Sequence, residues 1–117
     1  RILIMKNVEN IVKRIGLFVE AVENRLELTD NLEYTLINNT TYKDKTISTM
    51  LIDKGISAFS ASVRINAETV QIGLQNSEML LIAKIDGKAT TINDFDTKED
   101  MLSMFKDKVD LLVSKLI

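Results

Sequence analysis

Apolar residues recur along the first part of the chain with the period of an α-helix. Over residues 4–25 they fall at steps of three and four, at Val8, Ile11, Ile15, Phe18 and Val22. Polar residues fill the opposite positions, so the spacing predicts an amphipathic helix that buries one stripe. Gly16 stands inside this helix, where it costs about 1 kcal/mol relative to alanine unless something packs closely against it.

A second set of apolar residues widens this stripe on one side, namely Val12, Val19 and Leu26. A helix on a sheet needs only one stripe. The extra flank therefore has two interpretations, wider contact with the core or a seam between two copies of the chain. We take Val12, Val19 and Leu26 as candidate interface residues, and we expect a homo-oligomer, in the first place a two-fold dimer.

After this helix the period changes to two, which is typical of strands. Residues 26–28 and 32–36 alternate around the turn-prone residues 29–31, so we predict a hairpin there. A helix that continues to Ile37 is the alternative. Residues 38–45 form a polar segment, which we predict to be a loop.

Further strands are predicted over residues 47–52, 56–65, 70–74, 79–85 and 88–92. The turn after the first of these ends in Gly55, a residue suited to positive φ. Residues 79–85 are almost continuously apolar, which predicts a central strand that is covered on both faces.

The last segment predicts a second amphipathic helix. Residues 96–99 have the pattern of a capping box in which Asp96 is the cap and Glu99 reaches back. One face of the helix then carries Met101, Leu102, Phe105, Val109, Leu112, Val113 and Leu116. The sequence therefore predicts a single α+β domain over residues 1–117. In it, an antiparallel β-meander of five to seven strands packs against an N-terminal and a C-terminal amphipathic helix. Because the first residue is not Met, we also expect this domain to be a fragment of a longer chain.

The composition excludes most catalytic chemistry. The chain contains no His and no Cys, which excludes imidazole bases, thiol nucleophiles, disulfides and most zinc sites. Its formal net charge is −2, and its basic residues are scattered among acidic ones, so a nucleic-acid partner is not expected. No apolar run is long enough to span a membrane. We therefore predict that the domain is not an enzyme, binds no cofactor and has no membrane span. The lack of Cys fits a reducing compartment such as the cytoplasm.

One group of carboxylates resembles a metal site, namely Asp94, Asp96, Glu99 and Asp100. A calcium loop needs a glycine for its sharp turn, and no glycine lies between Asp94 and Asp107. We therefore assign the group to the start of the second helix and expect no metal.

By elimination, and from the widened stripe, the sequence predicts a non-catalytic protein–protein interaction or assembly domain that self-associates. The first alternative is a small-ligand or lipid-binding domain with a pocket between the sheet and the C-terminal helix. Its candidate lining residues are Met50, Phe59, Met79, Met101, Met104 and Phe105, for which ordinary core packing is the competing explanation.

The second alternative rests on a resemblance. The small size, the acidic pI of about 5.2 and the amphipathic C-terminal helix resemble the dedicated chaperones of type III secretion. That resemblance implies a dimer that wraps a segment of an effector protein. Those chaperones interrupt their strands with a central helix, which this sequence does not predict.

Overall fold

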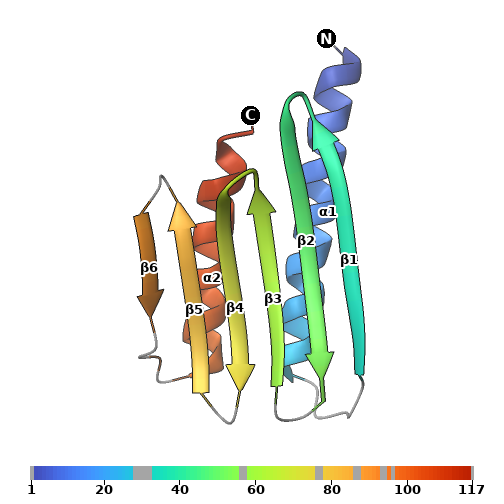
Figure 1. Ribbon diagram of the computed structural model, residues 1–117. Coiled ribbons are helices and arrows are strands. Elements are labelled where there is room, and N and C mark those ends of the chain that lie inside the picture. Colours follow the sequence, from blue (N-terminus) through green and yellow to red (C-terminus); the bar gives the residue numbers. More distant parts are fainter. Residues whose placement is uncertain are drawn as a thin grey trace.

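The computed structural model describes residues 2–27, 33–55, 58–75, 78–85, 88–92, 95 and 97–116. Along the chain these form α1 (Ile2–Glu27), β1 (Glu33–Tyr42), β2 (Lys45–Lys54), β3 (Ala58–Ile65), β4 (Glu68–Gln75), β5 (Glu78–Ile85), β6 (Lys88–Ile92) and α2 (Lys98–Ser114) (Figure 1). The predicted α+β fold, with a helix before and a helix after the strands, is confirmed.

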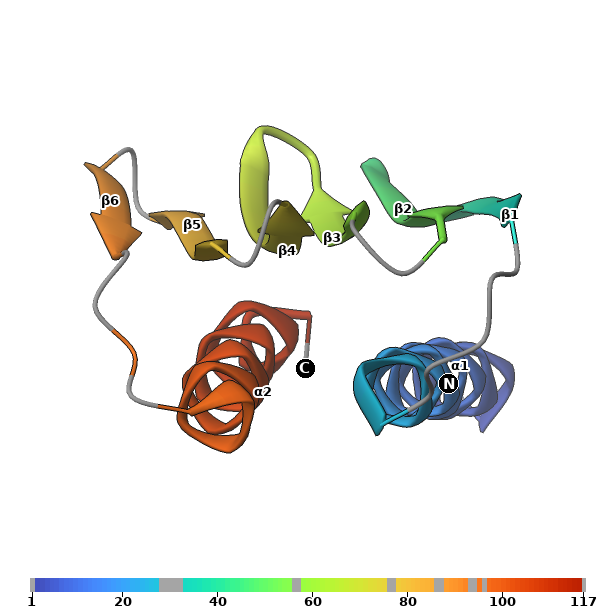
Figure 2. The ribbon, with the colours of Figure 1, turned by 90° about the horizontal axis from the view of Figure 1, so that it is seen from below.

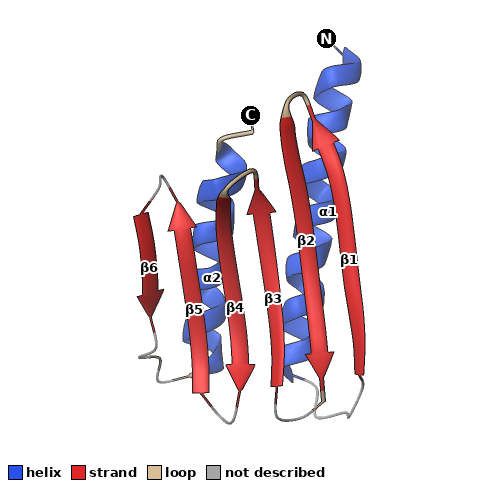
Figure 3. Ribbon diagram, viewed as in Figure 1, coloured by secondary structure: helices blue, strands red, loops and turns tan. Residues whose placement is uncertain are grey.

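The strands form one antiparallel sheet in the order β1-β2-β3-β4-β5-β6, which confirms the predicted meander (Figure 3). Each strand pairs with its neighbour in the sequence. The longest pairing joins β1 to β2, from Glu33 opposite Lys54 to Tyr42 opposite Lys45. Every ladder is therefore closed by a short connection.

Both helices cover the same face of this sheet. Seen along the strands, α1 lies under the half that contains β1 and β2, and α2 lies under β4 and β5 (Figure 2). The two helices run in opposite directions, side by side (Figure 1). Among the described residues no element covers the other face, which we call the open face.

The core lies between the sheet and the two helices. On the helix-covered face, Leu51, Ala61, Ile72 and Leu81 stand opposite one another in register, and each is at most 1% exposed. Helix α2 buries against them the face that the sequence predicted, from Met101 to Val113, and Leu116, just after the helix, is buried as well. Helix α1 contributes Ile11, Ile15 and Val22, which are part of its predicted stripe.

The end of the first helix differs from the prediction. Leu26 and Glu27 are the last residues of α1, not a strand, and the predicted turn at 29–31 lies outside the described residues. Leu26 continues the helical period of Val19 and Val22 and is 8% exposed, so packing favours the helix to this point. The alternative of a helix that reaches Ile37 is also wrong, because β1 begins at Glu33.

The polar segment 38–45 is not a loop. Its first five residues belong to β1, and only Lys43 and Asp44 form the turn to β2. An edge strand with side chains open to water accommodates polar residues, and their cross-strand contacts hold the register. The Ser48 hydroxyl, for example, donates a hydrogen bond of 2.6 Å to the side-chain oxygen of Asn39.

Strand β5 is not covered on both faces. Leu81 and Ala83 face the helices and are buried, whereas Ile82, on the open face, is 38% exposed. The prediction from the continuous apolar run is wrong because both helices lie on one side of the sheet, so the other face of β5 stays uncovered by any described element.

The cap of the second helix is also one residue later than predicted. Thr97, not Asp96, is the N-cap of α2, and its Oγ1 accepts a hydrogen bond of 3.1 Å from the backbone N–H of Asp100. Thr97 thus satisfies one of the unpaired donors of the first turn, as a side-chain cap does.

Candidate functional site: the groove between the helices

A groove runs between α1 and α2 on the side away from the sheet, and we call it the interhelical groove. Its first section has a volume of about 290 Å³. That section is lined by Val12, Ile15, Gly16, Val19 and Glu20 of α1 and by Lys106, Val109, Asp110 and Val113 of α2. It therefore combines an apolar lining with charged groups from both helices.

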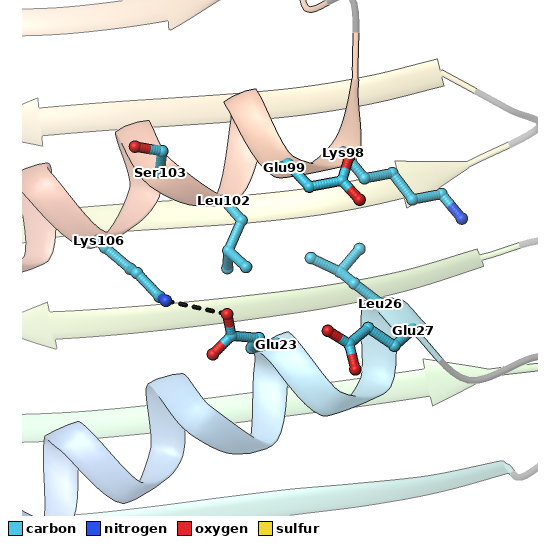
Figure 4. A pocket seen from close by; sticks show the side chains of 8 residues that line it. All are labelled: Glu23, Leu26, Glu27, Lys98, Glu99, Leu102, Ser103 and Lys106. Carbon is cyan, nitrogen blue, oxygen red and sulfur yellow. Dashed lines mark hydrogen bonds and ion pairs between the residues drawn. The ribbon is translucent and has the colours of Figure 1, made fainter.

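The second section, of about 200 Å³, lies at the end of α1 and the start of α2 (Figure 4). Its lining residues are Glu23, Leu26, Glu27, Lys98, Glu99, Leu102, Ser103 and Lys106. Leu26 and Leu102 approach each other from the two helices, and charged side chains surround them (Figure 4). Lys106 lines both sections, so the two adjoin each other along the pair of helices.

The helical period explains why these residues of α1 share one flank. Val12, Gly16, Val19 and Glu23 are spaced by four, three and four residues, which places them along one line of the helix, beside the buried stripe. Val12 and Val19 are half-buried, and Leu26 is buried. The structure thus brings the three candidate interface residues to one groove, with Val12 and Val19 in the first section and Leu26 in the second.

Gly16 has no packing explanation within the described chain. It is exposed, and a Cβ atom added to it would meet no atom within 4 Å. In the interior of a helix, glycine costs about 1 kcal/mol relative to alanine. The helix therefore carries a destabilising glycine at the wall of the groove. No close contact within the described chain explains why this position lacks a side chain.

Carboxylates outnumber ammonium groups along the groove. Glu20, Glu23, Glu27, Glu99 and Asp110 line it together with Lys98 and Lys106. The Nζ of Lys106 lies 3.0 Å from Oε2 of Glu23, so this ion pair bridges the two helices (Figure 4). Both side chains are more than a third exposed, and an exposed ion pair of this kind contributes at most about 1 kcal/mol. The Lys106–Glu23 ion pair therefore contributes little to holding the two helices together at the groove.

The C-terminal end of α1 is fixed by a buried ion pair. Arg25 donates through Nε and Nη2 to the two carboxylate oxygens of Asp53, at the end of β2, and through Nη2 to the carbonyl of Gly55. Its guanidinium also lies 5.5 Å from the centre of the Phe59 ring. Arg25 and Asp53 are only 7% and 3% exposed. The pair therefore anchors the C-terminal end of α1 to the turn that follows β2, and it holds the wall of the groove in place.

The surroundings of Asp53 also determine its protonation. Burial raises the pKa of the Asp53 carboxyl, but the hydrogen bonds from Arg25 and from the Gly55 N–H, with the charge of Arg25, outweigh burial. The net result is a pKa below the usual value of 3.8. Gly55 has φ of 95°, which confirms the predicted positive φ at this turn. Sequence reasoning missed the ion pair, although Asp53 stands in phase with the buried Leu51 and a charge there signals a buried partner.

The six residues proposed as a ligand pocket are not gathered in one cavity. Phe59, Met101 and Phe105 belong to the buried core, and Met79 and Met104 pack against its edge. Met50 lies on the open face, because its neighbour Leu51 faces the helices and successive side chains of a strand alternate. The sheet thus separates Met50 from the other five.

The acidic group at the start of α2 is only partly described. Asp94 and Asp96 lie outside the described residues, and Glu99 and Asp100 occupy the first turn of the helix. There they stand at the positive end of the helix dipole, which favours acidic side chains. Among the described residues, no three His, Cys, Asp or Glu side chains are grouped so that they could hold a metal ion. Neither described helix has the length and apolar character needed to cross a membrane.

No family model, no curated protein and no solved structure matches the chain. The geometry of the interhelical groove is therefore the basis for a function.

Proposed function

We propose that this chain is a non-catalytic protein–protein interaction domain that self-associates through the interhelical groove. The observation that carries the proposal is the first section of the groove, where half-buried Val12 and Val19 flank an exposed glycine whose added Cβ would meet no atom of the described chain within 4 Å. Contiguous apolar surface that stays accessible in a folded chain is typical of an interface. A second copy would bury these side chains.

The groove is a better candidate for recognition than for catalysis. Its lining consists of Val, Leu and Ile side chains together with carboxylates, ammonium groups and one serine. No His or Cys is present in the chain to supply a base or a nucleophile. An apolar centre with charged groups around it is the usual composition of a protein interface.

A second surface competes with the groove for the same role. Strand β1 is at one end of the described sheet, and its outer edge pairs with no described strand. Leu36 and Ile37 in the middle of this strand are 54% and 61% exposed. Exposed edge strands pair readily with other chains. An experiment on self-association must therefore distinguish the groove from the β1 edge.

The test compares two double lysine variants with matched charge changes. Val12→Lys with Val19→Lys alters the groove, and Leu36→Lys with Ile37→Lys alters the β1 edge. Sedimentation velocity from 1 to 100 µM gives the oligomeric state, and circular dichroism reports whether each variant is folded. We expect a wild-type dimer, a folded monomer for the groove variant, and a dimer for the edge variant.

Three results would contradict the proposal. A wild type that is monomeric at 100 µM would exclude self-association. Dissociation of the edge variant, with the groove variant still dimeric, would move the interface to β1. Unfolding of the groove variant would show that Val12 and Val19 belong to the core, which also contradicts an interface role.

A further inference from the structure

The groove specifies how two copies meet, if the proposed self-association holds. We infer that α1 of one copy packs antiparallel against α1 of a second copy, about a two-fold axis that passes beside Gly16. Gly16 is exposed at the wall of the groove, and no atom of the described residues lies within 4 Å of the position that a Cβ would take. A residue without a side chain lets a second backbone approach closely. A crossing point at Gly16 gives this glycine the packing partner that the described chain does not supply.

The valines are arranged around Gly16 as a two-fold contact requires. Val12 stands four residues before Gly16, and Val19 stands three residues after it, on the same flank of α1. An antiparallel pair centred on Gly16 sets Val12 against Val19 of the partner subunit, and the symmetry axis repeats this contact. A two-fold interface uses the same patch on both copies, so one stripe of apolar residues is sufficient.

The charges beside Val12 and Val19 indicate that the surface binds a second copy of this chain. They also determine whether the two α1 helices run parallel or antiparallel. Lys13 and Glu20 each follow one of the valines, so they lie about 100° further round the helix, both exposed. In an antiparallel pair, Lys13 faces Glu20 of the partner subunit, twice. In a parallel pair the two-fold axis runs along the helices and places this flank of the two copies on opposite sides of the contact, so Lys13 and Glu20 would meet no partner charge of this pattern. The pattern is therefore complementary to itself only in the antiparallel orientation.

The α2 side of the groove also supports packing of a second copy against the helices. Helix α2 adds Val109 and Val113 to the apolar lining of the same section. Two sheets would then enclose a four-helix layer, with the two α1 helices in contact at its centre. Residues of α1 that are half-buried in one copy would become buried in the pair.

A charge-swap experiment tests the orientation. Lys13→Glu and Glu20→Lys are made separately and together, and dimer dissociation constants are measured by sedimentation equilibrium. Each single variant sets like charges against each other at both contacts, so we expect its dissociation constant to rise about ten- to hundredfold. A 1:1 mixture of the two single variants restores two attractive contacts, and so does the double variant. We expect both to return to within about threefold of the wild type.

Lys84→Glu and Glu78→Lys are the matched controls. Both residues are exposed on β5, on the open face, and carry the same two charge changes away from α1. We expect the dissociation constant of each control to equal that of the wild type. Because the substituted side chains are all exposed, each variant should fold, and circular dichroism verifies this.

The outcomes separate this inference from the proposed function. A monomeric wild type would overturn both. A wild-type dimer whose single variants keep its affinity, or whose mixture fails to recover it, would overturn the antiparallel orientation and leave self-association intact. Recovery in the mixture and in the double variant, with unchanged controls, is the result that the inference requires.

Discussion

Substitution of Gly16 by alanine should change stability and association in opposite directions. Within the described residues of one copy, the added Cβ meets no atom within 4 Å, so it introduces no clash and no new contact there. What remains is the intrinsic preference of a helix interior for alanine, which is about 0.5–1 kcal/mol. For a domain of this size, such a gain raises the melting temperature by about 2–6 °C. Between two copies the same methyl groups meet at the closest approach and force the helices apart.

The measurement separates the two effects. Stability is measured by urea denaturation in the Val12→Lys, Val19→Lys background, where association does not contribute. There we expect Gly16→Ala to raise the free energy of unfolding by about 0.5–1 kcal/mol. Association is measured in the otherwise wild-type chain by sedimentation equilibrium, where we expect the dissociation constant to rise at least about tenfold, which corresponds to about 1.4 kcal/mol.

Two results would refute this reasoning. Loss of stability in the monomeric background would mean that an atom of the same chain occupies the space beside Gly16. A dissociation constant that stays at the wild-type value would mean that no second backbone approaches there. Ala21, a half-buried residue of the same helix, offers a control. Ala21→Gly should lower the free energy of unfolding by a similar amount without affecting association, because Ala21 does not line either section of the groove.

Four further predictions concern the residues that hold the groove in place. Arg25→Met leaves the buried Asp53 carboxylate without its main partner, so the free energy of unfolding should fall by about 3–5 kcal/mol in urea denaturation. The lowered pKa of Asp53 stabilises the fold above about pH 4, and this stabilisation is lost as the pH falls through the folded-state pKa. In Asp53→Asn, the free energy of unfolding should therefore fall less steeply as the pH is lowered below about 4. Leu112→Ala should cost about 2–5 kcal/mol, because Leu112 is 1% exposed, and a loss below half a kcal/mol would contradict its place in the core. Thr97→Ala removes the cap of α2 and should cost about 1 kcal/mol by thermal denaturation.

Hydrophobic periodicity was sufficient to predict the main elements, because each depends on its own residues. The buried face of α2 follows from the spacing of Met101, Phe105 and Leu112, and the meander follows from alternation within each strand. Where prediction failed, the deciding contact lies elsewhere in the chain. Polar residues of β1 became a strand because β2 pairs with them, and β5 is exposed on one face because both helices lie on the other.

The candidate site was predicted in part. The flank of Val12, Val19 and Leu26 follows from helical spacing, but the groove needs α2, which is about 80 residues away in the sequence and is placed by the sheet between them. The pairing of Arg25 with Asp53 likewise joins residues 28 positions apart, and no local pattern specifies which charges meet.

The most direct test of the antiparallel contact along α1 is disulfide formation by the Gly16→Cys variant. The chain contains no Cys, so the introduced thiol can pair only with that of a second copy. A disulfide requires Cα atoms within about 7 Å, which holds for a residue beside the two-fold axis. Glu9→Cys is the control, because Glu9 lies on nearly the same side of α1 as Gly16 but seven residues from the two-fold axis. At 1.5 Å per residue, the two copies of residue 9 would be about 21 Å apart along the helices. Under mild oxidation we predict a covalent dimer of Gly16→Cys and none of Glu9→Cys; equal cross-linking of both, or of neither, would contradict the account.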